Sequence, residues 1–225
     1  MLDNVIIIPY RAREKHLKYY LENTVPLLQK HIPNGKVVII EQDWNNKLFN
    51  RGCVLNIGIN EYKNKTKFFI SNDVDHNPDD DTIKHFYLNE NYDALAIQVG
   101  HNNSFGGVSK FSHDSIFQIN GFPNFIWGWG LEDRALYYRY LIMKKNISHK
   151  LMNKGKFKVL PHKHQGTNCH PNYHMLSEFE IAILNSKDYN KQYNHIMSSG
   201  LNNLQYKILE RKNINDYVKL IKVSI

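Results

Sequence analysis

Short apolar runs alternate with stretches of helical spacing along the first third of the chain. The runs are Val5–Ile8, Lys36–Ile40 and Lys67–Ile70, and continuous runs of this length are typical of strands buried on both faces. The first intervening stretch predicts a helix that Pro26 kinks or splits, and the second predicts a helix that opens at Arg51. This order of elements indicates a right-handed, parallel α/β unit.

The rest of the chain contains further strand and helix patterns but no internal repeat and no low-complexity linker. Strands are predicted at Tyr92–Val99, Phe157–Leu160, Leu204–Leu209 and Tyr217–Val223. Helices are predicted at Thr82–Leu88, at His113–Ile119, from Glu132 onward and over most of Met175–Ser198. Gly106 and Gly107 indicate a close backbone approach or a bulge. Because no linker separates these patterns, we expect residues 1–225 to form one domain.

The composition is that of a globular protein with a positive charge. The 225 residues are 42% hydrophobic and 12% aromatic, and the formal net charge is +8. The lysines are scattered singly, so we interpret the excess charge as compositional and not as a nucleic-acid-binding patch. Cys53 and Cys169 lie far apart and form neither a disulfide framework nor a paired-cysteine metal site. No apolar run approaches the ~18 residues of a membrane-spanning helix.

Charged side chains follow the predicted strands at the sheet edge where open α/β sheets bind ligands. Asp73, Val74 and Asp75 follow the third strand, and Arg11 and Arg13 follow the first. Two carboxylates one residue apart suit a hard divalent cation, and arginines suit a phosphate or a nucleotide. The same residue types also form strand-ending turns and solvated helix starts, so both interpretations stay open. The glycine-rich dinucleotide fingerprint is missing, which argues against a nicotinamide or flavin enzyme.

A second dense segment combines aromatic side chains, glycines and acids. Residues 125–134 read FIWGWGLEDR, so that glycines separate and flank two tryptophans. Tryptophan faces stack on sugar rings and nucleobases, although core packing also explains buried tryptophans. Glu132 and Asp133 fall in the first turn of a predicted helix, where acids also simply complement the helix dipole.

His162 and His164 lie two positions apart just after the strand predicted at Phe157–Leu160. Side chains at this spacing on a strand point to one face, so both imidazoles can meet one metal ion. A histidine pair without further partners is also common on protein surfaces. The spacing alone therefore leaves metal binding and a surface position as alternatives.

Seven sequence blocks, in this order, resemble the β-1,4-galactosyltransferase family. They are PYRAR at 9–13, FNR at 49–51, DVD at 73–75, FGGVS at 105–109, NGFPN at 120–124, WGWGLED at 127–133 and LNNL at 201–204. The resemblance implies a GT-A fold, in which a Rossmann-like mixed sheet is flanked by helices. It also implies an inverting, manganese-dependent transfer of a hexose from a UDP donor, with a nucleotide-binding half at 1–100 and an acceptor-binding, catalytic half at 101–225.

The resemblance assigns roles to individual residues. Donor-binding residues would be Pro9, Tyr10, Arg11, Arg13, Phe49, Asn50, Arg51, Asp73, Val74 and Trp129. Acceptor-binding residues would be Gly107, Gly130, Glu132 and Asp133, with Asp133 as general base and Glu132 as its catalytic neighbour. Metal ligands would be Asp75, His162 and His164, a pattern closest to the branch that transfers galactose to xylose.

These roles agree with the chemistry that the reaction needs. Aspartate together with imidazole suits manganese better than magnesium, which prefers oxygen ligands alone, and the metal neutralises the departing UDP. A single base without a second carboxylate as nucleophile gives one in-line displacement, and hence inversion.

The chain departs from the family at several positions. Arg134 follows Asp133 where the family's run of acids continues, and residues 101–104 (HNNS) stand where vertebrate relatives carry tyrosines. Ser104 leaves room for an acetamido group, so that both galactose and N-acetylgalactosamine remain candidate donor sugars. The paired cysteines and the membrane stem of secretory relatives are missing. We therefore expect a bacterial or viral cytoplasmic enzyme, or one of the Golgi lumen if an anchor has been removed.

We accordingly expect a hexosyltransferase with a UDP-sugar donor, a glycan or glycoconjugate acceptor, and no nucleic-acid partner or membrane span. The alternative is a non-catalytic UDP-sugar or glycan-binding module that kept the fold and lost turnover, because Arg134 interrupts the family's run of acids.

Overall fold

The structure is a computed structural model that describes residues 1–98, 103–143, 148–151, 154–162 and 173–225. Within these ranges, eight strands form one sheet in the order β7-β5-β6-β3-β1-β2-β10-β9, and β4 pairs with β8 in a second, two-stranded sheet. The strands are β1 Leu2–Tyr10, β2 Gly35–Gln42, β3 Thr66–Asn72, β4 His76–Pro78, β5 Ala94–Gln98, β6 Val108–Ser112, β7 His149–Leu151, β8 Phe157–Val159, β9 Lys207–Asn213 and β10 Val218–Ser224.

The centre of the large sheet is parallel, as the hydrophobic pattern predicts. β1 pairs in parallel with both β2 and β3, and β10 adds in parallel beside β2. The pairing of β1 with β3 ends at Ile7, whereas its pairing with β2 continues to Tyr10. Pro9 is tolerated in this central strand because β3 no longer pairs with β1 there.

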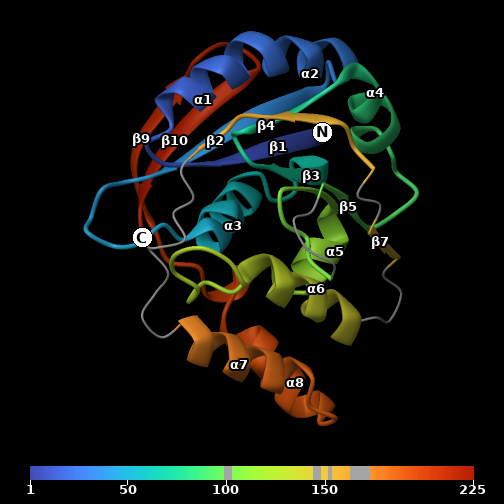
Figure 1. The fold of residues 1–225 in the computed structure, drawn as a ribbon, viewed down its shortest axis with the longest axis vertical. Coiled ribbons are helices and arrows are strands. Elements are labelled where there is room, and N and C mark those ends of the chain that lie inside the picture. Colours follow the sequence, from blue (N-terminus) through green and yellow to red (C-terminus); the bar gives the residue numbers. More distant parts are fainter. Residues whose placement is uncertain (99–102, 144–147, 152–153, 163–172) are drawn as a thin grey trace.

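Both faces of the sheet are covered, and neighbouring residues of one strand face opposite sides. Val5 and Ile7 belong to one hydrophobic cluster, whereas Ile6 and Ile8 belong to another. In Figure 1, α1 and α2 lie along one face, and α3, α5 and α6 lie on the other. Burial on both faces explains why the strands read as continuous apolar runs instead of alternating ones.

The helices also follow the predicted pattern, with one irregularity. The predicted break near Pro26 is present, because a π-helical turn at Tyr20–Thr24 separates α1 from α2. The predicted region Met175–Ser198 contains two helices, which pack below α6 in Figure 1. The helices are α1 Glu14–Tyr19, α2 Val25–His31, α3 Arg51–Glu61, α4 Asp80–Thr82, α5 His113–Gln118, α6 Glu132–Ile142, α7 Tyr173–Leu184 and α8 Tyr189–Ser198.

One central strand was not predicted from the sequence. β6 lies antiparallel between β3 and β5, which makes the sheet mixed. Its side chains Ser109 and Lys110 are buried although they are polar, so the segment lacks the apolar run that marks the other strands. The close approach predicted for the adjacent glycines is present, since a Cβ on Gly107 would collide with the carbonyl oxygen of Gln98.

Candidate active site

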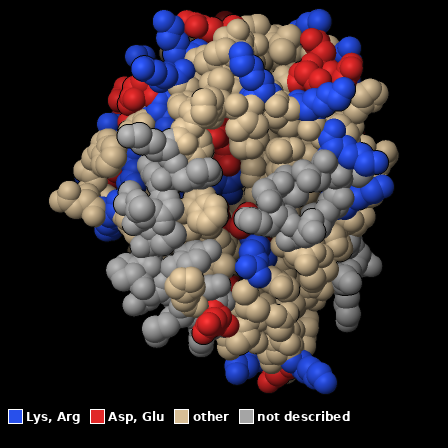
Figure 2. Space-filling view, viewed as in Figure 1, with Lys and Arg blue, Asp and Glu red and all other residues tan. Residues whose placement is uncertain are grey.

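A cavity of about 560 Å³ lies where β1 and β3 end. The other walls are the start of α3, the glycines near 106 and the segment from Gly128 into α6. Figure 2 shows acidic and basic side chains meeting in a recess at the centre of one face of the molecule. The carboxyl edge of the parallel strands therefore carries the candidate site, as expected for an open α/β sheet.

Most residues that the sequence singled out line this cavity. They are Pro9, Arg11, Arg13, Phe49, Arg51, Asp73, Val74, Asp75, Gly107, Trp129, Gly130, Glu132, Asp133 and His162. Tyr10 and Asn50 do not line it, and both are buried. The Asn50 side chain instead accepts from the Cys53 amide at the start of α3 and donates to the Asn124 carbonyl oxygen. His164 lies outside the described residues.

Asp75 is the centre of a cluster of positively polarised groups. Its Oδ2 atom lies 2.9 Å from Nε2 of His162 and 3.5 Å from Nη1 of Arg13. Its Oδ1 atom lies 3.1 Å from Nδ1 of His76. The structure thus brings the predicted acid of the third strand and the predicted histidine after β8 into direct contact.

The electrostatics of this cluster favour an ionised carboxylate. Burial raises the pKa of Asp75, but the hydrogen bond from His76 and the charges of His76, Arg13 and His162 outweigh it and lower this pKa to about 2. Burial also lowers the pKa of His76, but its hydrogen bond to Asp75 and the charges of Asp73 and Asp75 produce a net increase.

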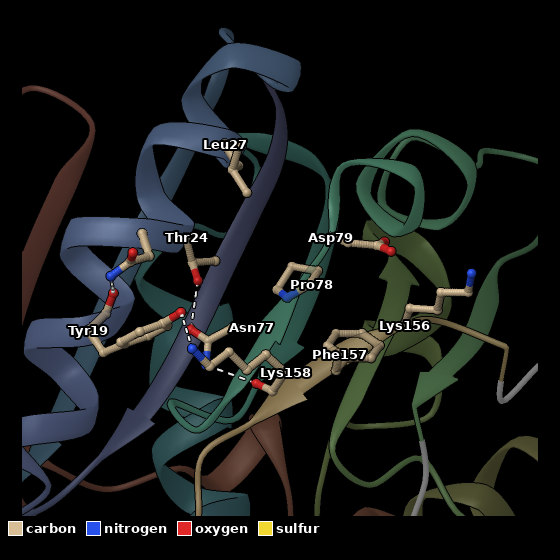
Figure 3. A pocket seen from close by; sticks show the side chains of 10 residues that line it. Tyr19, Thr24, Leu27, Asn77, Pro78, Asp79, Lys156, Phe157 and Lys158 are labelled. Atoms are coloured by element: carbon tan, nitrogen blue, oxygen red, sulfur yellow. Dashed lines mark hydrogen bonds between the residues drawn. The ribbon is translucent and has the colours of Figure 1, made fainter.

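The small β4–β8 sheet brings His162 to Asp75. In β4, the Asn77 side chain donates to the Lys158 carbonyl oxygen at 3.1 Å and accepts from the Thr24 hydroxyl at 2.6 Å. Lys158 of β8 in turn donates to the Tyr19 hydroxyl at 2.9 Å. Figure 3 shows these side chains joining the helical segment after β1 to both short strands. The buried Thr24–Asn77 hydrogen bond and the more exposed contacts of Lys158 therefore fix the chain that continues to His162.

The donor set fits a divalent transition metal. Asp73, Asp75 and His76 each offer one ligand atom, and these three atoms lie within 4.8 Å of one another. The imidazole of His162 also contacts Asp75 and is a second candidate nitrogen ligand. Two carboxylates with imidazole nitrogen suit manganese or a neighbouring divalent ion, whereas magnesium prefers oxygen ligands. His76 was not among the predicted ligands, and its position directly after Asp75 was the available signal.

Arg51 connects the ends of three elements. From the first turn of α3, its Nε donates to Asp73 at 2.8 Å and its Nη1 to Glu132 of α6 at 3.3 Å. Among the described residues, Arg51 Nη2 and Glu132 Oε2 are buried without a hydrogen-bond partner. Buried polar atoms without partners are unfavourable, so this part of the cavity wall has unused capacity to bind a polar ligand.

Glu132 and Asp133 are neighbours in sequence but lie in different environments. Glu132 is buried, and burial together with the charge of Asp133 outweighs Arg51 and raises its pKa to about 7. Asp133 is half-buried and lines the cavity. Its carboxylate lies against Gly106, where a Cβ atom would collide with Oδ2. Of the two acids, Asp133 is therefore the one that is open to a substrate.

The segment that leads into α6 has an unusual backbone. Gly128 and Gly130 have φ values of 90° and 91°, and Leu131 has 82°. Such values favour glycine, and a leucine there stores strain of about 1–3 kcal/mol. Trp129, between the two glycines, is 51% exposed. The glycines let this large side chain stand at the rim of the cavity, and the backbone strain is typical of a functional segment.

The cavity also contains residues for which the sequence suggested no site role. Besides His76, these are Asn103, Gly106, Gly128, Leu131, Arg134 and Tyr138. Arg134 and Tyr138 are one helical turn apart on α6, and their spacing four residues apart was the available signal.

The sequence matches protein-family models and known proteins. A model of the N-terminal region of glycosyl transferase group 7 matches residues 2–87, and a model described as the N-terminal domain of galactosyltransferase matches residues 87–163. β-1,4-Galactosyltransferase 1 of Bos taurus is 32% identical over 223 residues, which are 96% of this chain and 52% of the relative. β-1,4-Galactosyltransferase 6 of Homo sapiens is 31% identical over 212 residues, which are 90% of this chain and 52% of that relative. The chain thus spans about half the length of these relatives.

Solved structures share the fold. A mutant Drosophila β-1,4-galactosyltransferase 7, in complex with manganese, UDP-Gal and xylobiose, has a TM-score of 0.76 at 19% identity and covers 100% of this chain and 94% of that one. The structure of S. aureus TarS has a TM-score of 0.56 at 14% identity, and the match covers 87% of this chain and 69% of that one. The fold is thus the GT-A fold of sugar-nucleotide transferases, which confirms the predicted fold class. The chain belongs to the β-1,4-galactosyltransferase family of glycosyl transferase group 7.

Proposed function

We propose that this protein transfers a hexose, galactose or N-acetylgalactosamine, from a UDP donor to a hydroxyl of a sugar acceptor. The observation that carries the proposal is that Asp75, His162 and Asp133 line one cavity. A metal-binding carboxylate, its imidazole partner and a candidate base are the three groups that such a transfer needs in one place. The relative with the shared fold that holds manganese, UDP-Gal and xylobiose supports this assignment.

We assign donor binding to residues at the ends of β1 and β3 and at the start of α3, within the nucleotide-binding half at 1–100. Arg11 and Arg13 follow β1, Phe49 and Arg51 flank the start of α3, and Asp73 and Val74 follow β3. Arginine forks suit the diphosphate, and the Phe49 ring suits the uracil base. Since Tyr10 and Asn50 are buried outside the cavity, we assign them a supporting position behind the donor site and not direct contact.

We assign the metal to Asp75 and His162, with Asp73 and His76 at hand. When bound, manganese supplies positive charge that neutralises the leaving diphosphate. The chain's own contribution is a carboxylate that stays ionised, because surrounding imidazole and guanidinium groups lower the pKa of Asp75 to about 2 although burial raises it. The Arg13 and His162 contacts also fix the orientation of this carboxylate before any ligand arrives.

We assign general-base catalysis to Asp133. It is half-buried and faces the cavity, whereas Glu132 is buried and bound to Arg51. Asp133 would accept the proton of the acceptor hydroxyl as this oxygen attacks the anomeric carbon. Because Glu132 is paired with Arg51, no second carboxylate of this pair is free to act as nucleophile, and one displacement inverts the configuration.

We place the acceptor within the half at 101–225, between Trp129 and the start of α6. Gly107, Gly130, Glu132 and Asp133 all line the cavity. The backbone at Gly130 brings Trp129 to the rim, where its indole ring would cover the donor sugar. A non-catalytic binding module is not favoured, since both acids and the metal-ligand set are retained.

The compartment stays a prediction. Among the described residues, no helix is both long and apolar enough to cross a bilayer. The relatives named above from Bos taurus and Homo sapiens give no support to the expected bacterial or viral source.

The test is a coupled assay of UDP release from UDP-galactose and UDP-N-acetylgalactosamine with manganese, with and without monosaccharide acceptors. We expect acceptor-stimulated release that falls about 10²- to 10⁴-fold in Asp133→Asn, the usual contribution of a general base. Acceptor-independent release, or full activity of the Asp133→Asn variant, would contradict the proposal.

A further inference from the structure

We propose that Arg134 and Tyr138 form a subsite for an acidic acceptor, so that the saccharide carries a carboxylate beside the hydroxyl that Asp133 deprotonates. This inference rests on the proposed function and specifies its acceptor. Both side chains line the cavity and are half-buried. They lie at positions i and i+4 of α6, which places them on one helix face.

The other arginines of the cavity are already engaged. Arg13 contacts Asp75 at 3.5 Å, and Arg51 binds Asp73 at 2.8 Å and Glu132 at 3.3 Å. Arg11 donates to a backbone carbonyl oxygen at 3.0 Å and lies 4.8 Å from the ring centre of Trp44.

Arg134 differs from these three arginines. Among the ion pairs of the described residues, none involves Arg134, although Asp133 precedes it directly. In the described part of the chain, the Arg134 guanidinium thus lines the cavity without forming an ion pair with a carboxylate. An anionic ligand can supply the missing partner.

The position of Arg134 points to the acceptor and not to the donor. The arginines assigned to the donor follow β1 and open α3, whereas Arg134 belongs to α6 and follows the proposed base. An acceptor hydroxyl must approach Asp133 to lose its proton, so a group on the next residue of the helix meets the acceptor. Asp133 and Arg134 point in different directions around the helix, and this lets one acceptor present a hydroxyl to the first and a carboxylate to the second.

The chemistry of the pair suits a uronic or similar sugar acid. The planar guanidinium binds a carboxylate through two parallel hydrogen bonds, and the Tyr138 ring offers a face for the sugar ring next to it. A neutral sugar would cover the Arg134 charge without pairing it, which is unfavourable, whereas a carboxylate would pair it. The net charge of +8 also favours the approach of acidic glycans.

The experiment compares two saccharides that differ only at C6. Methyl β-glucuronide and methyl β-glucoside, and the matching galacturonide and galactoside, are titrated into the full chain with UDP and manganese, and binding is followed by NMR. We expect the acidic member of at least one pair to bind about 10- to 100-fold more tightly, the range of a hydrogen-bonded charge pair. Arg134→Met should remove this preference. Arg134→Lys should keep part of it, because lysine has the positive charge but cannot form the two parallel hydrogen bonds of a guanidinium.

The control is Arg211→Met, which removes the same charge from the edge strand β9, where Arg211 pairs with Glu61 at 2.6 Å. It should keep the full preference for the acidic saccharide. Equal binding of both members by the wild type in every pair, or a preference that persists in Arg134→Met, would overturn the inference. Binding is measured without turnover, so failure of the proposed function would show in UDP release and not in these titrations.

Discussion

Nε2 of His162 lies 2.9 Å from Oδ2 of Asp75, although the two residues follow strands of different sheets. The contact joins the end of β3 to the segment after β8, and it depends on the pairing of β4 with β8. A carboxylate and an imidazole held together in this way, next to arginines, form the core of the proposed metal and diphosphate site.

Asp75→Asn should abolish metal-dependent activity while the chain stays folded. The amide keeps the shape of the side chain but loses the charge, and we expect manganese to bind at least about 100-fold more weakly in the presence of UDP. Free manganese is measured by electron paramagnetic resonance during a titration. Asp81→Asn is the matched control, because Asp81 is exposed on α4. Unchanged manganese affinity of the Asp75→Asn variant would remove Asp75 from the metal site.

Gly106→Ala should impair catalysis through Asp133. The added methyl group collides with Asp133 Oδ2, the far end of a side chain that can rotate away. We therefore expect kcat to fall about 10- to 100-fold, as a misplaced base loses part of its contribution, with little change in melting temperature. If the effect passes through Asp133, the Gly106→Ala/Asp133→Asn double variant is no slower than Asp133→Asn alone. Additive losses would show that Gly106 acts on something else.

Glu132 should make stability depend on pH. Burial, together with the charge of Asp133, raises the pKa of this acid from its ordinary value to about 7 in the folded chain. Between about pH 4.5 and 7 the folded chain therefore keeps a proton that the unfolded chain has lost, so stability falls as the pH rises, by about 3 kcal/mol at most. Urea unfolding of the wild type and Glu132→Gln across this range measures the difference. If the unfolding free energy of the wild type changed with pH in the same way as that of Glu132→Gln, the raised pKa of Glu132 would be contradicted.

Lys110 should have the opposite effect at alkaline pH. Burial in β6 lowers the pKa of this lysine to about 8, although its amine donates to the Tyr87 carbonyl oxygen at 2.7 Å. From about pH 8 to 10.5 the unfolded chain holds the extra proton, so the wild type gains up to about 3 kcal/mol relative to Lys110→Met. Denaturant unfolding of both proteins at pH 7, 8, 9 and 10 tests this. We expect the difference in unfolding free energy between the two proteins to be constant below pH 8 and to change only above it.

Apolar runs predicted the parallel strands, because burial on both faces leaves a clear mark in the sequence. Val5–Ile8 and Lys36–Ile40 became β1 and β2, and Pro26 marked the irregular helix. β6 could not be found in this way. Its buried Ser109 and Lys110 interrupt the apolar pattern, since tertiary contacts and not local propensity place them there.

The acids at strand ends and the block around Asp133 identified most residues of the cavity. Which of them touch could not be known, because the Asp75–His162 contact depends on the β4–β8 pairing of two three-residue strands. His76 was overlooked although it directly follows Asp75 in the sequence. Asn50 matched the family motif, yet its side chain caps α3, a role that only coordinates reveal.

The most direct test of the account is a crystal structure with manganese and UDP, with anomalous scattering recorded at the manganese edge. We predict one anomalous peak within about 2.0–2.4 Å of an Asp75 carboxylate oxygen and a His162 imidazole nitrogen, the range of such ligand bonds. The same ion should contact the diphosphate, in the cavity that Asp133 lines. UDP bound elsewhere, or a manganese peak away from Asp75, would contradict the account.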